Sequence, residues 1–272
     1  MRAWSGQRRQ AGRIVGLVPT MGALHEGHLS LIELAHRRAD DVVVSIFVNP
    51  LQFERGGDFD RYPRPIDDDV AACGAAGVAA VYAPTAATMY PVGFQTHVVP
   101  GPLAGVMEGA MRGGHFQGVL TVVAKLFGAA RPHVAVFGEK DFQQIAIVRQ
   151  MVDDLDMGVE ILAGPIVREP DGLALSSRNR LLPPDDRIAA RCVPHSLDAA
   201  AAAAAAGERD IAAIESAARA VVADEPRARL EYVTVFDPLT LRPLEVLDGT
   251  ARIATAVWFG DIRLIDNREV TG

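Results

Sequence analysis

The chain is poor in the features that mark secreted, membrane-bound or disulfide-stapled proteins. It has only two cysteines, Cys73 and Cys192, which are too few for a disulfide framework or a zinc ribbon, so we expect inert thiols in a reducing compartment. No apolar run is long enough to span a membrane. The N-terminus contains arginines but lacks the apolar segment of a secretory signal. These absences predict a cytoplasmic protein with no membrane partner.

Positive charge is scarce as well. The 27 lysines and arginines are outnumbered by 34 aspartates and glutamates, which gives a formal net charge of -7. Because no basic stripe is present and phosphate backbones would be repelled, we expect no nucleic-acid partner. An anionic small molecule remains possible, since a local cluster of cations can oppose the overall charge. The 272 residues, 49% of them hydrophobic, suffice for one large or two ordinary globular domains.

The segment Val18–His28 carries the strongest local signal. An apolar run over residues 14–18 is followed by small turn residues and then by an apolar-periodic segment from Leu29. This order predicts a strand, a short loop and a helix whose first turn carries His25 and His28. Because a helix N-terminus offers unpaired N–H groups and a partial positive charge, we hypothesise a nucleotide-phosphate site here.

Two other interpretations of the histidine pair stay open. Histidines in the first turn of a helix are often plain surface residues. The pair could also supply two zinc ligands, but the metalloprotease motif needs histidines four residues apart, and these are three apart. No second Cys/His cluster completes a set of four ligands, so we predict no resident metal site.

Two further predicted strands end in polar residues. The apolar run Val42–Val48, typical of a strand buried in a parallel sheet, is followed by Asn49 and Gln52, and the run over residues 133–137 is followed by Lys140. Open parallel sheets bind ligands at the carboxyl ends of their strands, where a lysine is a natural point charge for phosphate. Taken alone, Asn49 is better explained as a turn former before proline.

Carboxylates near predicted helix starts have structural explanations. The aspartates at residues 67–69 could bind a metal, but helix capping and the helix dipole explain them better. Asp141, with Gln144 three residues later, matches a capping box.

Several segments give weak signals. Residues 1–12 show no clear period, so we expect a frayed lead-in. We also expect a flexible glycine-rich segment over residues 108–118 and additional short strands near residues 96–99 and 241–246.

The composition changes near residue 167. The loop Ser176-Ser177-Arg178 could grip phosphate oxygens, and it is followed by two helical stretches, one of them rich in alanine, and by alternating segments typical of consecutive antiparallel strands. We therefore predict an α/β fold. A Rossmann-like, doubly wound parallel sheet would occupy residues 1–167, and a smaller C-terminal α+β domain, which we expect to act as a lid, would occupy residues 168–272.

Taken together, four motifs closely resemble those of the pantoate–β-alanine ligase family. They are Val18–His28, Val44–Phe53 (VSIFVNPLQF), Gly138–Gln144 (GEKDFQQ) and Asp171–Asn179 (DGLALSSRN). The likeness continues through Tyr62–Arg64 and His115–Val119, so it covers nearly the whole chain. HEGH is similar to the HxGH signature of the nucleotidyltransferase superfamily, and the Ser-Ser-Arg loop is similar to its second phosphate-gripping motif.

The resemblance implies a function in pantothenate and coenzyme A biosynthesis. This is the ATP-dependent condensation of (R)-pantoate with β-alanine through a pantoyl-adenylate, with Mg²⁺ and with release of pyrophosphate and AMP. It also implies a homodimer.

The resemblance also implies roles for individual residues. His28 resembles the family's proton donor. The groups expected around the phosphates are His25, His28, Lys140 and Arg178. The side chains expected at pantoate and β-alanine are Gln52, Gln144 and Asn49. The other expected ATP contacts are Met21, Gly22, Ala23, Leu24, Glu26, Gly27, Gly138, Glu139, Asp141, Val167, Leu175, Ser176 and Ser177.

The sequence departs from the family pattern in two places. Leu175 stands where the family usually has methionine, an apolar exchange of similar volume that should be mild, and the chain begins closer to the first strand than is usual. Two other functions remain as alternatives. Another nucleotidyltransferase would stop at a stable nucleotide product, and a nucleotide-binding regulatory protein would not catalyse ligation. A tRNA-charging enzyme is disfavoured by the acidic charge and by the lack of an anticodon-binding region.

Overall fold

The computed structural model describes residues 1–53 and 58–272. The chain forms two compact units. The first comprises Met1–Glu139 and Gln143–Pro165, and the second comprises Lys140–Phe142 and Ile166–Gly272. The expected boundary between independent domains at residues 167 and 168 stays a prediction.

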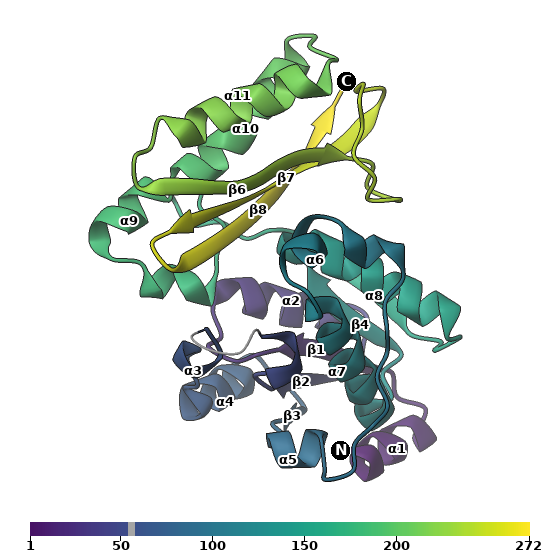
Figure 1. The fold of residues 1–272 in the computed structure, drawn as a ribbon. Helices are drawn as coiled ribbons and strands as arrows, with labels where there is room; N and C mark the ends of the chain where they lie inside the picture. The colour runs from purple at the N-terminus through teal and green to yellow at the C-terminus, as the bar shows by residue number, and fades with distance from the viewer. Residues whose placement is uncertain (54–57) are drawn as a thin grey trace. The chain divides into compact units, whose positions relative to one another are not determined.

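A parallel sheet of five strands is the centre of the first unit (Figure 1). The strands are β1 Val15–Thr20, β2 Asp41–Ile46, β3 Ala80–Tyr82, β4 Val134–Gly138 and β5 Glu160–Gly164. Their order is β3-β2-β1-β4-β5, and every neighbouring pair is parallel. The order reverses between β1 and β4, which is the kind of switch point where open α/β sheets bind ligands.

Helices connect these strands and cover both faces of the sheet. They are α1 Arg2–Gln10, α2 Glu26–His36, α3 Asp58–Arg61, α4 Ile66–Ala75, α5 Ala86–Met89, α6 Met107–Met111, α7 His115–Ala130 and α8 Phe142–Asp154. Short 3₁₀ turns are η1 Pro50–Gln52, η2 Pro102–Gly105 and η3 Glu139–Asp141.

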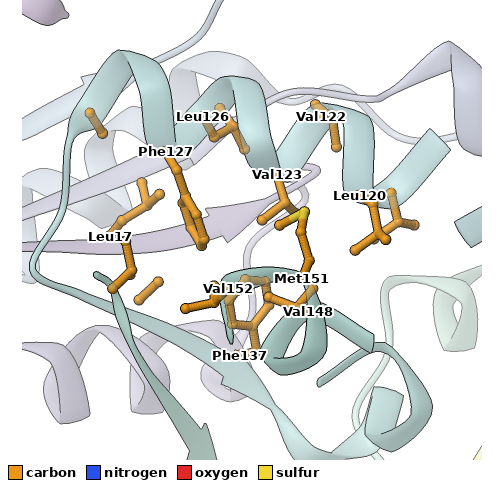
Figure 2. Packing of buried hydrophobic residues seen from close by; sticks show 14 of the residues in the cluster. Leu17, Leu120, Val122, Val123, Leu126, Phe127, Phe137, Val148, Met151 and Val152 are labelled. Carbon is orange, nitrogen blue, oxygen red and sulfur yellow. The ribbon is translucent and has the colours of Figure 1, made fainter. Parts of the chain in front are cut away.

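The strands have apolar side chains on both faces, as the continuous apolar runs predict. Leu17 and Phe137 point to one face, where they pack against α7 and α8 (Figure 2). Val18 and Val136, one position away, pack on the opposite face with side chains of α2 and with Cys73 of α4. This two-layer burial holds the central strand β1 in place, and β1 leads directly into the HEGH motif.

The prediction of a frayed N-terminus was wrong, because residues 2–10 form the helix α1. Ser5 is fully buried, and its Oγ donates to the carbonyl oxygen of Ala130 at the end of α7. Met1 and Trp4 pack against the same apolar cluster. The helix is anchored by tertiary contacts that a local periodicity does not reveal.

One other weak prediction was also wrong. Residues 96–99 form no strand; instead the backbone N–H of Val98 donates to Thr121 Oγ1, at 3.1 Å. The expected flexibility of residues 108–118 stays a prediction; within this segment α6 ends at Met111 and α7 begins at His115.

The second unit has an antiparallel sheet of three strands in the order β6-β7-β8. Its elements are η4 Ser177–Leu181, α9 Pro184–Ala189, α10 Cys192–Ala205, α11 Ile211–Ala223, β6 Ala228–Phe236, β7 Thr250–Phe259 and β8 Ile262–Thr271. The alanine-rich helix α10 packs beside α11 against this sheet (Figure 1). Residues 241–246 form isolated bridges and no named strand, contrary to the prediction. The predicted fold class, a parallel α/β sheet followed by a smaller α+β unit, is confirmed.

Candidate active site

Three neighbouring strands of the first unit bring candidate residues to one edge of the sheet. The loop 21–25 follows the central strand β1, Asn49 and Gln52 follow β2, and Gly138 ends β4. Because all three strands are parallel and adjacent, their carboxyl ends lie at the same edge.

The two histidines of HEGH meet at the start of α2. His25 is the N-cap residue with an extended backbone, and His28 is the third residue of the helix. The ring centroids are 4.0 Å apart and the ring planes are tilted by 35°. The expected pairing of the imidazoles at a helix N-terminus therefore exists in the fold.

A backbone hydrogen bond sets the orientation of the His28 ring. The N–H of His25 donates to His28 Nδ1, at 3.3 Å, in the arrangement of a capping box. A ring nitrogen that accepts carries no proton, so a neutral His28 carries its proton on Nε2. The ring can thus present an Nε2–H donor to an anionic ligand.

The loop between β1 and α2 is held by a buried carboxylate. Asp69 of α4, which is 2% exposed, accepts hydrogen bonds from the backbone N–H groups of Ala23, at 2.9 Å, and Leu24, at 2.7 Å. Gly22 and Ala23 both have positive φ, 84° and 51°. The helix-capping explanation was therefore wrong for Asp69, because both of its oxygens bond to a distant loop and the N-cap residue of α4 is Pro65.

Gln52 is oriented by a network of amides. Asn49 Nδ2 donates to Gln52 Oε1, at 3.0 Å, and Gln52 Nε2 points at the sulfur of Met21, at 3.1 Å. Tyr90 donates its hydroxyl to Asn49 Oδ1, at 2.7 Å. Asn49 itself is 1% exposed. It is therefore placed to orient the Gln52 amide from inside the protein.

The backbone of Gln52 is fixed as well. Its carbonyl oxygen lies 2.8 Å from His115 Nδ1 and accepts from Arg112 Nη2, at 3.2 Å. Gly118 lets α7 approach this turn closely, since a Cβ atom there would lie 2.2 Å from the carbonyl oxygen of Leu51. The motif HFQGV thus supports the Gln52 turn.

The adjacent glutamines of α8 behave differently. Gln143 is buried, and its amide bonds to the backbone of Leu103, Val106 and Glu108. The side chain of Gln144 is half-buried and makes no hydrogen bond to any other described residue. The amide of Gln144, unlike that of Gln143, keeps its bonding capacity for a ligand.

Lys140 lies in the short stretch of the GEKDFQQ motif that belongs to the second unit. Its backbone carbonyl accepts from Asn267 Nδ2, at 2.9 Å, and the neighbouring Phe142 lies beneath the Arg252 guanidinium, 4.1 Å from ring centroid to Cζ. The Lys140 ammonium is 4.0 Å from Asp141 Oδ2, and its side chain is 18% exposed. The hydrogen bond from Asn267 fixes the backbone of Lys140.

The Ser-Ser-Arg loop follows a small hairpin of the second unit. Leu175 donates its backbone N–H to the carbonyl of Val167, at 2.9 Å, so these two predicted nucleotide contacts lie side by side. Ser176 caps the turn η4 and accepts from the N–H of Arg178, at 3.3 Å. The Ser176 hydroxyl therefore fixes the backbone of the turn that carries Ser177 and Arg178.

Charged side chains hold this hairpin and loop together. Arg187 of α9 bonds to Glu169, at 2.6 Å, and to Asp171, at 2.7 Å. Asn179 Nδ2 donates to Glu169 Oε1, at 2.6 Å. The Arg187 guanidinium keeps the pKa of the Asp171 carboxyl below its usual range, so this carboxyl is charged at neutral pH.

The described residues contain no group of three or more His, Cys, Asp or Glu side chains placed to hold a metal ion. Mg²⁺ often binds to nucleotide phosphates and water with few protein ligands. A magnesium ion held mainly by phosphate oxygens and water would need no such group of side chains. Within residues 1–53 and 58–272, no helix is long and apolar enough to cross a bilayer.

The structure thus divides the predicted site residues between the two units. The first unit holds the residues of the HEGH loop and those that follow β2 and β4, namely Met21–His28, Asn49, Gln52, Gly138, Glu139 and Gln144. The second unit holds Lys140, Asp141, Val167 and Leu175–Arg178. Their common action on one substrate stays a prediction.

Sequence reasoning missed two supporting residues. They are Asp69, which bonds to the HEGH loop, and Tyr90, which bonds to Asn49. Each acts on a residue that the sequence did single out. The run of aspartates at residues 67–69 was the one sequence feature that drew attention to Asp69.

Comparisons with known proteins agree with the arrangement of these motifs. The family model described as pantoate-beta-alanine ligase matches residues 1–269. The chain is 48% identical to the pantothenate synthetase of Geotalea daltonii over 268 residues, covering 98% of this chain and 95% of the relative. It is 51% identical to the pantothenate synthetase of Chloroflexus aurantiacus over 263 residues, covering 96% and 93%.

Solved structures give the same result. The crystal structure of pantothenate synthetase from Thermus thermophilus superposes with a TM-score of 0.94 at 47% identity, covering 98% of both chains. The pantoate-beta-alanine ligase of Francisella tularensis, complexed with beta-gamma ATP and beta-alanine, superposes with a TM-score of 0.81 at 34% identity, covering 97% of this chain and 94% of that one. This chain therefore belongs to the pantoate–β-alanine ligase family.

Proposed function

We propose that the protein joins pantoate to β-alanine at the expense of ATP, through a pantoyl-adenylate. The observation that carries the proposal is the position of the HEGH imidazoles and the Gln52 amide, which follow the adjacent strands β1 and β2 in a chain of this family. A phosphate-binding helix terminus beside an amide pocket suits a reaction between a triphosphate and a small hydroxy acid.

In the first half-reaction a carboxylate oxygen of pantoate attacks the α-phosphorus of ATP. The bond from that phosphorus to the bridging oxygen breaks, and pyrophosphate leaves with the electron pair. Both reactants are anionic, so the protein's main tasks are to position them and to compensate negative charge. His28, through Nε2–H, and His25 would do so at the N-terminus of α2. Lys140 and Arg178 would add full positive charges.

Neutral amides suit the pantoate subsite because they orient the acid without neutralising its nucleophilic carboxylate. With its oxygen bonded to Asn49 and one N–H donated to the Met21 sulfur, Gln52 has one further Nε2–H to donate. Gln144 on α8 has both amide functions available among the described residues. We expect both side chains to donate to oxygens of pantoate, and replacing either should weaken pantoate binding more than ATP binding.

In the second half-reaction the neutral amine of β-alanine attacks the acyl carbon of the adenylate. The carbon–oxygen bond breaks, AMP leaves, and the amine loses a proton as the amide forms. When bound together with ATP, Mg²⁺ would supply charge compensation for the pyrophosphate that leaves in the first half-reaction. The remaining catalysis is orientation of the amine toward a fixed acyl group.

Product analysis tests this proposal. Purified protein is incubated with ATP, Mg²⁺ and pantoate, with and without β-alanine, and pantothenate, AMP and pyrophosphate are quantified. We expect equal amounts of the three products only when β-alanine is present. A stable nucleotide product that accumulates regardless of β-alanine would identify another nucleotidyltransferase, and no turnover would favour a nucleotide-binding regulatory protein.

The family resemblance also supports a homodimer in the cytoplasm as part of the proposal. Light scattering coupled to size-exclusion chromatography should give twice the chain mass of 29.0 kDa. A monomer mass at micromolar concentration would contradict the dimer.

A further inference from the structure

The loop that precedes HEGH depends on one carboxylate from a different helix. Asp69 lies on α4, more than forty residues after the loop, and both of its oxygens are used: Oδ2 accepts from Ala23 N–H and Oδ1 from Leu24 N–H. A carboxylate that accepts two backbone N–H groups in a buried site makes strong, directional, charge-assisted hydrogen bonds.

We propose that Asp69 is a positioning residue of the nucleotide site. It fixes the backbone of the loop that leads into α2 and thereby the positions of His25 and His28. This inference rests on the proposed function, because it assigns Asp69 to the ATP side of that reaction. Asp69 would act through the loop and would not touch the nucleotide.

The backbone conformation of the loop explains why such an anchor is needed. Gly22 and Ala23 follow each other at φ 84° and 51°, and a left-handed conformation is unfavourable for a residue with a side chain such as Ala23. Strained positions persist only where surrounding interactions over-determine them. One of the two Asp69 hydrogen bonds is to the N–H of Ala23, so the carboxylate holds the strained residue directly.

Steric contact reinforces the same anchor. A Cβ atom added at Gly22 would lie 2.7 Å from Asp69 Oδ2 and 3.0 Å from Ile46 Cγ2. The carboxylate therefore fills the space that a side chain at this position would need. The glycine and the aspartate form one packing unit beneath the loop.

Two simpler roles for Asp69 do not match its contacts. It does not cap α4, whose N-cap residue is Pro65 and has no side-chain capping bond. Nor do the described residues around it include a group of three possible metal ligands. With both oxygens turned to the loop amides, its role is to fix the backbone.

The Asp69 hydrogen bonds also determine which backbone N–H groups near the start of α2 can bind phosphate. The N–H groups of Ala23 and Leu24 are bonded to Asp69, and that of His25 is bonded to His28 Nδ1. We therefore expect the phosphates to meet the imidazoles and the first amides of α2, beginning at Glu26. The N–H groups of Ala23, Leu24 and His25 would take no part.

The substitution Asp69→Asn separates geometry from charge, because the two effects have opposite signs. Removing a negative charge near a triphosphate should strengthen ATP binding. An asparagine keeps one acceptor but turns an NH₂ group toward the second backbone N–H, so it should loosen the loop and weaken ATP binding. We expect the geometric effect to dominate.

The experiment compares Asp69→Asn with the control Asp41→Asn and with wild type. Asp41 is also a buried aspartate of the first unit, 6% exposed, but it begins β2 at the opposite edge of the sheet and pairs with Arg13. Binding of Mg·ATP is measured by calorimetry at 10 °C, melting temperature by scanning calorimetry, and KM for ATP and pantoate in the ligation assay.

For Asp69→Asn we expect the Kd and KM for ATP to rise about tenfold, the loss of one charge-assisted hydrogen bond, with KM for pantoate changed by less than about twofold. Asp41→Asn should lower the melting temperature and leave ATP affinity unchanged. ATP affinity within about twofold of wild type in Asp69→Asn, or an equal loss in Asp41→Asn, would overturn the proposal.

A second variant keeps the test decisive if Asp69→Asn fails to fold. Gly22→Ala pushes a methyl group against the same carboxylate and should reproduce the selective loss of ATP affinity; normal ATP binding by a folded Gly22→Ala protein would contradict the anchor. If wild type binds ATP but forms no pantothenate, the proposed function fails. The ATP affinities of the variants and of wild type, measured by calorimetry, still test the role of Asp69.

Discussion

Asn49 has its hydrogen-bonding groups engaged inside the first unit. Its NH₂ group donates to Gln52 Oε1 and to the carbonyl of Gly118, and its Oδ1 accepts from Leu51 N–H and the Tyr90 hydroxyl. The resemblance places Asn49 near pantoate, which stays a prediction. The geometry favours an indirect contribution in which Tyr90 and Asn49 together select the orientation of the Gln52 amide.

The substitution Tyr90→Phe tests this relay. It removes one donor to Asn49 Oδ1, so the Asn49 amide is less strictly held and Gln52 samples the wrong orientation more often. We expect KM for pantoate to rise about threefold to tenfold, the usual cost of a neutral hydrogen bond, with KM for ATP unchanged. Steady-state kinetics with each substrate varied in turn measures both constants.

A Tyr90→Phe protein whose KM for pantoate and for ATP change together would point to a general loosening of the fold. Unchanged kinetics would remove Tyr90 from the pantoate subsite.

Lys140 is the residue whose role is most electrostatic. Its ammonium would stabilise charge that builds up on pyrophosphate only as the bond breaks, so Lys140→Ala should slow adenylation by roughly 10²–10³, the scale of one transition-state-stabilising group. Single-turnover measurement of pyrophosphate release reports this step directly. A rate within about twofold of wild type would exclude Lys140 from the chemical step.

At the scale of secondary structure, the beginning of β1 is tied to the beginning of β4 by a histidine. The backbone N–H of Val15 donates to His133 Nδ1, at 2.9 Å, which requires that nitrogen to be unprotonated. Burial, followed by the nearby charge of Arg9, lowers the pKa of His133 from 6.5. This contact lies at the edge of the sheet opposite the candidate site.

The lowered pKa of His133 has a consequence for stability. Below pH 6.5 the unfolded chain takes up a proton that the folded chain binds less readily, so this contribution to stability is present above pH 6.5 and is lost as the pH falls toward the lowered folded value. We expect the melting temperature of wild type to fall more between about pH 7.5 and about pH 5.5 than that of His133→Asn, which cannot titrate. Scanning calorimetry at both pH values makes the comparison; equal falls would contradict the assignment.

Elements with strong local signals were predictable, and elements anchored over long range were not. The strand–loop–helix around HEGH was confirmed because an apolar run, turn residues and an apolar period follow one another in the sequence. Helix α1 was missed because its anchor, the bond from Ser5 to Ala130, spans 125 positions. The expected strand over residues 96–99 failed because apolar alternation alone provides no partner strand.

The same distinction applies to the candidate site. Motifs that carry chemistry in consecutive residues, HEGH and the Ser-Ser-Arg loop, are visible in one sequence. Asp69 and Tyr90 are not, because each acts on a residue more than forty positions away. Their identities become interpretable only when the fold brings α4 beneath the HEGH loop and α5 beside the end of β2.

For the whole molecule, the central claim is that the chain activates pantoate as an acyl-adenylate. Residues of both units would take part in this reaction. The imidazoles and amides belong to the first unit, and Lys140 and Arg178 belong to the second. The net charge of the chain does not distinguish this activation from other reactions. An overall charge of -7 is compatible with anionic substrates when a local cluster of cations and oriented N–H groups opposes it.

Isotope transfer tests this claim most directly. Pantoate with ¹⁸O in both carboxylate oxygens is turned over with ATP, Mg²⁺ and β-alanine, and the products are analysed by mass spectrometry. An acyl-adenylate requires one labelled oxygen in AMP and one in the amide carbonyl of pantothenate. Label in inorganic phosphate, with ADP as the nucleotide product, would show activation as an acyl-phosphate and would contradict the account.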